Sequence, residues 1–154
     1  MQDYGNRKLI FSASDLTSAT ECSWAIVRKI DKKLGFSIEI PSDADDGMLA
    51  RTGELGNLHE AKQLELYRKE FGDSVVELAR PDYGKTGPSL EEQMISLTQA
   101  TKQALDSKAP VVFQGTFFDG VFQGFADFLV LQADGSYAVY DTKLARRAKI
   151  TALV

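Results

Sequence analysis

The chain has 154 residues, of which 44% are hydrophobic and 26% are charged; these values are typical of one globular domain and exclude a disordered tail. The formal net charge of -4 argues against a protein that only binds nucleic acid, because phosphate contacts draw on lysine and arginine. The single cysteine excludes an internal disulfide, and no apolar run matches a membrane span or a signal peptide, so we expect a cytoplasmic protein with no membrane partner.

The N-terminal segment is predicted to form a helix or a pair of helices. Ser12, with Asp15 three residues later, is an acidic version of the capping box that marks a helix start. The helical region is expected to continue to about Leu34, because Gly35 then supplies a residue that ends helices. The thiol of Cys22 is expected to lie in the core.

A longer helix is predicted from about Gly53 to Phe71. Its apolar residues recur at helical spacing and form the expected buried stripe: Leu64, Tyr67 and Phe71. His59, the only histidine in the chain, lies near the N-terminal end of this helix. Its position alone favours a surface or hydrogen-bonded histidine over a metal ligand.

The next segments contain a short strand candidate, a loop and a second long helix. The strand candidate covers residues 75–78 and the loop covers residues 81–88, which include two glycines and two prolines. A helix is predicted from Ser89 to about Lys108, because Ser89 and Glu92 form a capping box and apolar residues follow at helical spacing.

The remaining chain is predicted to form an antiparallel meander of three strands: 111–118, 121–132 and 136–143. Asp119-Gly120 is a signal for a two-residue hairpin loop, which would pair Phe118 with Val121. Helices that precede such a sheet indicate an α/β (α+β) fold, with helices packed on a mainly antiparallel sheet.

The register of the second hairpin decides which side chains meet. A two-residue loop would pair Asp127 with Thr142. A three-residue loop at 133–135, with Gly135 in the left-handed region, would place Asp127 directly opposite Asp141. Like charges in opposite positions destabilise a sheet, but a divalent cation between them would justify the arrangement. We therefore predict the three-residue loop.

A lysine joins these two acids. Lys143 follows Asp141 at a spacing of two, so both would point to the same face of the strand. The predicted polar face gathers Gln114, Thr116, Gln123, Asp127, Asp141 and Lys143 among the apolar Val121, Phe125, Leu129 and Val139. The opposite face, which includes Ala126 and Phe128, is almost entirely apolar. An ordinary half-exposed sheet alternates in the same way without any site. The two acids and the lysine together, inside apolar strands, favour a site that polarises a phosphate and activates water.

Three motifs in order carry a family resemblance: Gly56-Asn57-Leu58-His59-Glu60 on a helix, Gly124-Phe125-Ala126-Asp127 on a strand and Asp141-Thr142-Lys143 on the next strand. With these motifs the chain resembles the RecB-like nucleases of the PD-(D/E)XK superfamily, including CRISPR-associated RecB-like exonucleases. The resemblance extends from about residue 10 to residue 154. It implies a single nuclease domain over 1–154 with a restriction-endonuclease-like core.

The resemblance also assigns roles to residues. It implies that His59, Asp127, Asp141 and the backbone carbonyl of Thr142 bind Mg²⁺ or Mn²⁺, with an imidazole ligand favouring Mn²⁺. It gives the catalytic roles to Asp127, Asp141 and Lys143, the lysine orienting the attacking water or stabilising charge on the phosphate. The implied activity is exonuclease-like hydrolysis of DNA phosphodiester bonds in repair, recombination or defence.

The chain departs from the family pattern in two ways. Family members usually continue into a helix with a Gln and a Tyr that line the site, so we expect these residues to be an N-terminal fragment, with a helicase or second nuclease domain in the same polypeptide. Some members hold an iron–sulfur cluster through four cysteines, which Cys22 alone cannot support. Arg146, Arg147 and Lys149 are the candidate DNA contacts.

A second function stays open from the sequence. A RecB-like fold that has lost its chemistry would serve as a scaffold for DNA or for a partner protein. The intact Asp127, Asp141 and Lys143 favour the enzyme, because retaining these charges without a function is costly. The acidic net charge and the early end of the chain favour the scaffold.

Overall fold

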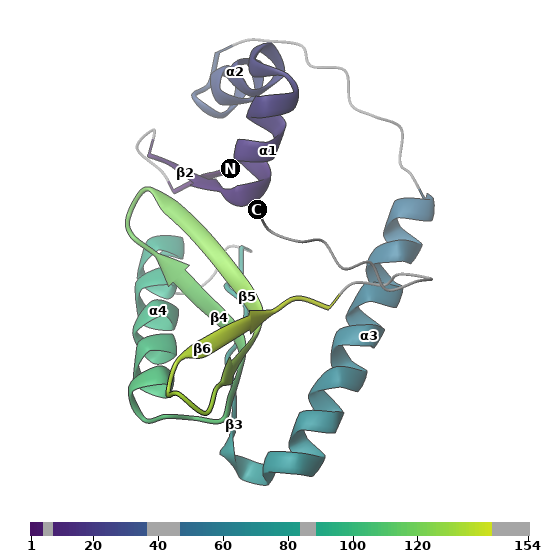
Figure 1. The fold of residues 1–154 in the computed structure, drawn as a ribbon. Helices are drawn as coiled ribbons and strands as arrows, with labels where there is room; N and C mark the ends of the chain where they lie inside the picture. Colours follow the sequence, from purple (N-terminus) through teal and green to yellow (C-terminus); the bar gives the residue numbers. More distant parts are fainter. Residues whose placement is uncertain (5–7, 37–46, 84–88, 143–154) are drawn as a thin grey trace.

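The structure is a computed structural model that describes residues 1–4, 8–36, 47–83 and 89–142, apart from the side chains of residues 47–50. The chain combines a mixed sheet with helices, as the α+β prediction states (Figure 1). In chain order the elements are β1 (Gln2–Asp3), β2 (Leu9–Ser12), α1 (Ala13–Glu21), α2 (Ser23–Lys33), α3 (Gly47–Phe71), η1 (Gly72–Ser74), β3 (Val75–Glu77), α4 (Leu90–Asp106), β4 (Val111–Phe118), β5 (Phe122–Leu131) and β6 (Tyr137–Tyr140). No helix among the described residues has the length and apolar character needed to cross a membrane.

The predicted meander β4–β5–β6 is confirmed and forms the centre of a larger sheet. The strand order of the whole sheet is β1-β2-β5-β4-β3, and β6 is also paired to β5. β2 pairs with β5, and β3 with β4, in parallel orientation. β4 pairs along one edge of β5, so β2 and β6 share the other edge. β2 pairs with Phe122 and Gln123 of β5, and β6 pairs with residues 128–131. Residues 124–127 of β5 therefore lie between these two partners.

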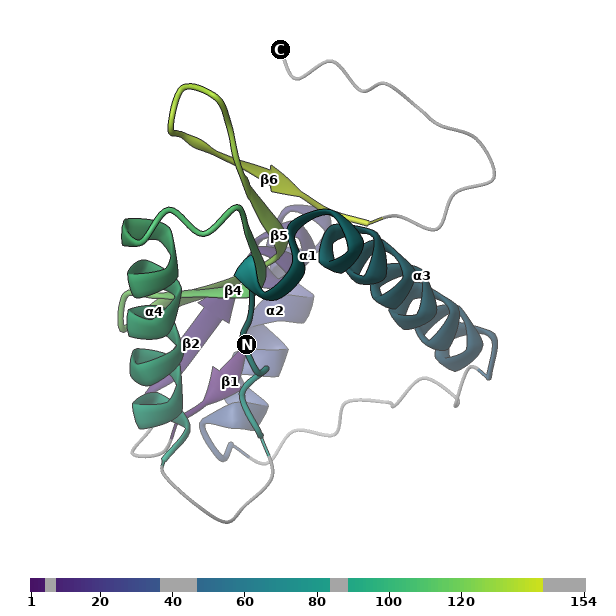
Figure 2. The ribbon, with the colours of Figure 1, turned by 90° about the horizontal axis from the view of Figure 1, so that it is seen from below.

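Two helices cover opposite faces of the sheet (Figure 2). On the α4 side the buried cluster comprises Ala104, Ala109, Val112, Ala126 and Leu129. On the α3 side the predicted stripe of Leu64, Tyr67 and Phe71 packs against Val111 and Phe128. Phe128 is fully buried, with its ring centroid 5.2 Å from that of Tyr67 and 5.0 Å from that of Phe113. Burial of one such ring contributes about 2–3 kcal/mol, so this cluster fixes α3 on the sheet.

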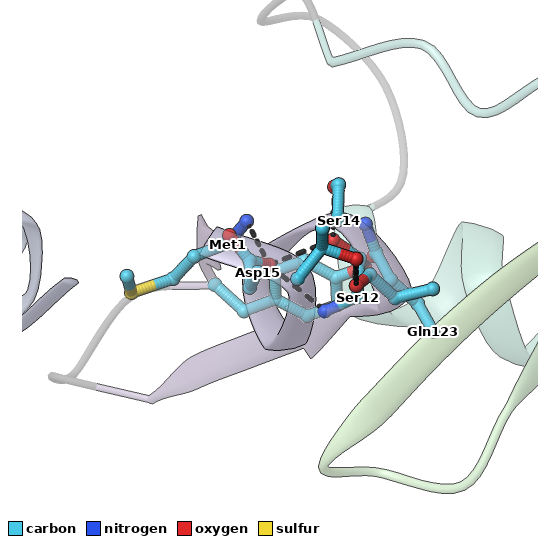
Figure 3. Close-up of polar contacts among 8 residues, drawn as sticks. Met1, Ser12, Ser14, Asp15 and Gln123 are labelled. Atoms are coloured by element: carbon cyan, nitrogen blue, oxygen red, sulfur yellow. Dashed lines mark hydrogen bonds and ion pairs between the residues drawn. The ribbon is translucent and has the colours of Figure 1, made fainter. Parts of the chain in front are cut away.

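The N-terminal helix pair begins and ends as the sequence predicts. The carboxylate of Asp15 accepts hydrogen bonds from the backbone N–H of Ser12 at 2.9 Å and from its hydroxyl at 2.7 Å, and it also contacts the terminal ammonium of Met1 (Figure 3). Gln123 of β5 lies beside Ser12 in the same view, because these two residues are partners in the β2–β5 pair. At the other end, Leu34 caps α2 and Gly35 follows with a φ of +86°.

Cys22 is exposed, and the prediction that it lies in the core is wrong. The residue has an extended backbone and forms both the C-cap of α1 and the N-cap of α2. As a cap it lies outside the regular turns of both helices, so it is not part of the repeating apolar face of either.

The long helices differ in how well their starts were predicted. α4 follows the capping box at Ser89, whose backbone N–H donates to Glu92 at 2.7 Å. α3 begins at Gly47 and not at about Gly53. The residues between these glycines include Met48, Leu49 and Ala50, which favour helix strongly enough to extend it through a glycine.

The β4–β5 loop differs from its prediction by one residue. Phe118 pairs with Gln123 and not with Val121, so the two-residue loop is Gly120-Val121. The cause is Asp119, whose carboxylate accepts hydrogen bonds from the N–H groups of Val121 at 2.8 Å and Phe122 at 2.7 Å. Because the pairing moves by two residues, this shift alone does not move any side chain to the other face of the sheet.

Candidate active site

The β5–β6 hairpin has the predicted three-residue register. Phe128 pairs with Tyr140 and Leu129 with Val139, and Gly135 has a φ of +82° in the loop. The same register, continued past the end of β6, places Asp127 opposite Asp141. The loop therefore brings together the two acids that the sequence assigned to a metal site.

The two carboxyl groups interact directly. The register sets the side chains of Asp127 and Asp141 close enough for each to affect the ionisation of the other. Burial raises the pKa of Asp127 above its usual 3.8, and the neighbouring carboxyl of Asp141 raises it further. The backbone N–H of Thr142 donates to Oδ2 of Asp127 at 3.3 Å and lowers this pKa only in part. The surrounding groups therefore do not fully compensate the negative charge of the two acids.

A third carboxylate, Glu60 on α3, lies near enough to this pair to be affected by its charge, and was not identified from the sequence as a site residue. Its side chain is 18% exposed. Burial raises the pKa of Glu60, and the charges of Asp127 and Asp141 raise it further. The sequence signal was present in the motif that contains His59, where the glutamate is the next residue.

His59 is exposed on α3, next to Glu60 in the sequence. Successive residues of a helix differ in direction by about 100°, so two neighbours do not face the same partner. Since the carboxylate of Glu60 is hydrogen-bonded to Gln114 on β4, it is Glu60 that faces the sheet at this level of the helix. The metal-ligand role of His59 stays a prediction.

The sheet does not have the two uniform faces that strict alternation predicts. Leu129, predicted on the face of Asp127, packs in the cluster beneath α4. Ala126 and Phe128 were predicted on one face, yet Ala126 packs on the α4 side and Phe128 on the α3 side. The break coincides with Gln114, which has a φ of +60° in the middle of β4. Gln114 has no partner in the ladder between the pairs Phe113 with Phe128 and Gly115 with Ala126, so the regular pleat is interrupted in both strands at this level.

Arg80 completes the polar cluster. Its Nε donates to Oε1 of Gln114 at 2.6 Å, and its Nη2 lies 3.4 Å from Oε2 of Glu60. Nε2 of the same glutamine donates to Oε2 of Glu60 at 3.0 Å. The charge of Arg80 lowers the pKa of Asp127 and of Glu60, but burial and the neighbouring acids outweigh it. A cavity of about 440 Å³ opens here, lined by Asn57, Glu60, Ala61, Leu64, Leu78, Arg80, Phe113 and Gln114.

The described residues fit a hard cation in ligand type but do not complete its shell. No group of three or more His, Cys, Asp and Glu within these residues is arranged to hold a metal ion. Mg²⁺ is commonly held by one or two carboxylates, with water and substrate phosphate as further ligands. Asp127 and Asp141 supply that pair. The hydroxyl oxygen of Thr142 beside them is buried without a hydrogen-bond partner in the described structure.

The remaining predicted site residues lie outside the part of the chain that the structure describes. These are Lys143, Arg146, Arg147 and Lys149. Comparison of the chain with protein-family models, with curated proteins and with solved structures gave no match.

Proposed function

We propose that this chain is a nuclease module that hydrolyses DNA phosphodiester bonds with the help of Mg²⁺ or Mn²⁺. The observation that carries the proposal is the pair Asp127 and Asp141, which the β5–β6 register sets opposite each other and in which burial and the neighbouring carboxyl disfavour charge on Asp127. Two carboxylates in this relation are destabilising in a sheet unless a cation sits between them. A hard divalent ion is the partner that carboxylate oxygens prefer.

In this proposal the two acids hold the metal ion and Thr142 orients one of them. The ion would polarise the phosphate and activate water, which is the chemistry that hydrolysis of a phosphodiester needs. The N–H of Thr142 holds Oδ2 of Asp127 in place, so the pair is preorganised before substrate binds. Lys143 would follow the second acid and stabilise charge on the phosphate. The arrangement of β4, β5 and β6 between α3 and α4 is compatible with a restriction-endonuclease-like core.

Cleavage of DNA by the natural polypeptide tests this proposal. Single-stranded and duplex oligonucleotides would be incubated with Mg²⁺, Mn²⁺ or EDTA, beside Asp127→Asn and Asp141→Asn. We expect cleavage that requires the metal and falls at least a hundredfold in both variants, as for removal of a group that stabilises the transition state. Cleavage that persists in both variants would place the chemistry elsewhere. Metal-independent DNA binding with no cleavage would favour the scaffold function instead.

A further inference from the structure

The backbone at Gln114 is unusual for its position. Among the described residues only Lys108 and Gln114 have positive φ without being glycine. Lys108 follows the C-cap of α4, where left-handed residues are common. Gln114 lies inside β4, between the pairs Phe113 with Phe128 and Gly115 with Ala126, where such a backbone is unfavourable. Strain of this kind is concentrated at functional sites, where the surrounding structure maintains it.

The strained backbone places the side chain of Gln114 between two charged partners. It is 4% exposed, and both ends of its amide are hydrogen-bonded, the oxygen to Arg80 and the nitrogen to Glu60. The orientation of the amide follows from its partners, since a guanidinium only donates and a carboxylate only accepts. Gln114 therefore connects α3 to the segment after β3 and fixes the direction of the guanidinium.

Arg80 keeps most of its binding capacity unused. A guanidinium has five N–H donors, and within the described residues only Nε and one N–H of Nη2 have partners. The side chain is 58% exposed and lines the cavity, so the remaining donors are accessible. Its contact with Glu60 at 3.4 Å is long, and an ion pair with one largely exposed partner contributes little to stability. A structural role leaves both the strained backbone and the free donors unexplained.

The position of Arg80 beside the acids indicates what it binds. The guanidinium shares the cavity with Glu60, which lies 3.4 Å from it, and its charge lowers the pKa of Asp127 as well as that of Glu60, so it lies within electrostatic range of the acid pair. A phosphodiester that approaches a cation held by two acids still presents an anionic oxygen to its other side. The planar fork of an arginine matches phosphate oxygens in a bidentate manner.

We propose that Arg80 binds the non-bridging oxygens of a backbone phosphate of the nucleic-acid substrate, and that Gln114 is the positioning residue that holds the guanidinium for this contact. The inference rests on the proposed function for its substrate class. The contact is sequence-independent, because it reads the phosphate and not the base. It supplies a local cation where the net charge of the whole chain is unfavourable for nucleic acid.

Equilibrium binding separates this contact from catalysis. The background is the double variant Asp127→Asn with Asp141→Asn, in which the proposed chemistry is blocked and the two repelling charges are absent. The affinity for a fluorescein-labelled single-stranded oligonucleotide and for its duplex would be measured by anisotropy over a range of salt concentrations. Arg80→Gln is expected to raise Kd about tenfold and to reduce the slope of log K against log salt by about 0.7–0.9, the value for one phosphate contact. The Kd of Arg80→Lys should lie between those of the background and Arg80→Gln, because lysine keeps the charge but lacks the planar fork of N–H donors.

Arg68→Gln is the matched control. It also removes one arginine charge, but at a site near the C-terminal end of α3, where Arg68 pairs with Glu65 and Glu77. This variant should leave Kd and the salt slope unchanged. If Arg80→Gln and Arg68→Gln change them equally, or if neither does, Arg80 does not bind a phosphate.

Gln114→Asn tests the positioning role. Asparagine tolerates the left-handed backbone but is one methylene shorter, so its amide no longer spans both partners. We expect an unchanged circular dichroism spectrum, weaker binding, and no additional weakening when Gln114→Asn is combined with Arg80→Gln. Additive losses would overturn the positioning role.

Two outcomes separate this inference from the proposed function. If the acid variants abolish cleavage but Arg80→Gln leaves binding unaltered, the proposed function survives and the role of Arg80 fails. If no oligonucleotide is bound or cut, both fail.

Discussion

The backbone N–H of Thr142 donates a hydrogen bond to Oδ2 of Asp127 over 3.3 Å, just past the end of β6. The link between the two strands thus continues through a side chain where the ladder of backbone pairs stops. Its effect is to hold Asp127 against Asp141, the residue before Thr142. The position of this acid pair depends on the hairpin loop, on the charges around it and on the sheet that supports it, and each of these can be tested.

The first prediction concerns the charge of Asp127. In EDTA at neutral pH, Asp127→Asn should raise the free energy of unfolding by about 0.2–1 kcal/mol, because it removes a like charge opposite Asp141. The pKa of Asp127 is raised in the folded state, so the parent chain is penalised only above that pKa. The advantage of the variant should therefore shrink as pH falls through the raised pKa and disappear near 3.8. Urea unfolding over this pH range measures it.

Asp134→Asn provides the control in the same hairpin. Hydrogen bonds from the hydroxyl and N–H of Ser136 lower the pKa of Asp134, so its charge stabilises the fold. This variant should lose stability at neutral pH, and the loss should disappear as pH falls through the lowered pKa. The same sign for both variants would refute the assignment of opposite environments.

The second prediction concerns the loop that sets the register. Gly135→Ala should destabilise the chain by about 1–2 kcal/mol, because its φ of +82° is unfavourable for an L-residue. Crowding adds little, since the nearest atom to the new Cβ is Nζ of Lys108 at 3.9 Å. Gly53→Ala, inside α3 with no atom within 4 Å of the new Cβ, should instead stabilise by about 0.5–1 kcal/mol. Thermal unfolding of both variants distinguishes a conformational cost from a general effect of glycine replacement.

The third prediction concerns the attachment of α4 to the sheet. The buried N–H of Thr116 donates to the hydroxyl of Thr101 at 2.9 Å. Thr101→Val keeps the shape but leaves this N–H without a partner, so the free energy of unfolding should fall by about 1–3 kcal/mol. One turn earlier, the hydroxyl oxygen of Thr98 is buried without a partner within the described residues. Thr98→Val should be neutral or stabilising, and equal losses in the two variants would contradict the hydrogen-bond explanation.

Features encoded by neighbouring residues could be predicted from the sequence. The capping box at Ser89 gave the start of α4, and the stripe of α3 packs as its spacing indicates. The register that sets Asp127 against Asp141 followed from Gly135 and from the cost of opposing charges. In each case the signal lies within a few residues of the feature that it determines.

Features that depend on distant partners could not be predicted. No local pattern indicates a left-handed Gln114, because glutamine has no preference for that backbone and its conformation is maintained by Glu60 and Arg80 from other elements. The parallel pairing of β2 with β5 is likewise a long-range contact. The β4–β5 loop was shifted because a side-chain interaction of Asp119 competes with the standard turn of Asp119-Gly120.

Anomalous diffraction from crystals equilibrated with Mn²⁺ shows whether Asp127 and Asp141 together hold a metal ion. The expected result is a manganese peak about 2.0–2.3 Å from a carboxylate oxygen of Asp127 and of Asp141. The peak should be lost in crystals of Asp141→Asn treated in the same way. A saturated crystal with no peak between the two acids, or a peak that is unchanged in the variant, would mean that this pair does not hold the metal ion.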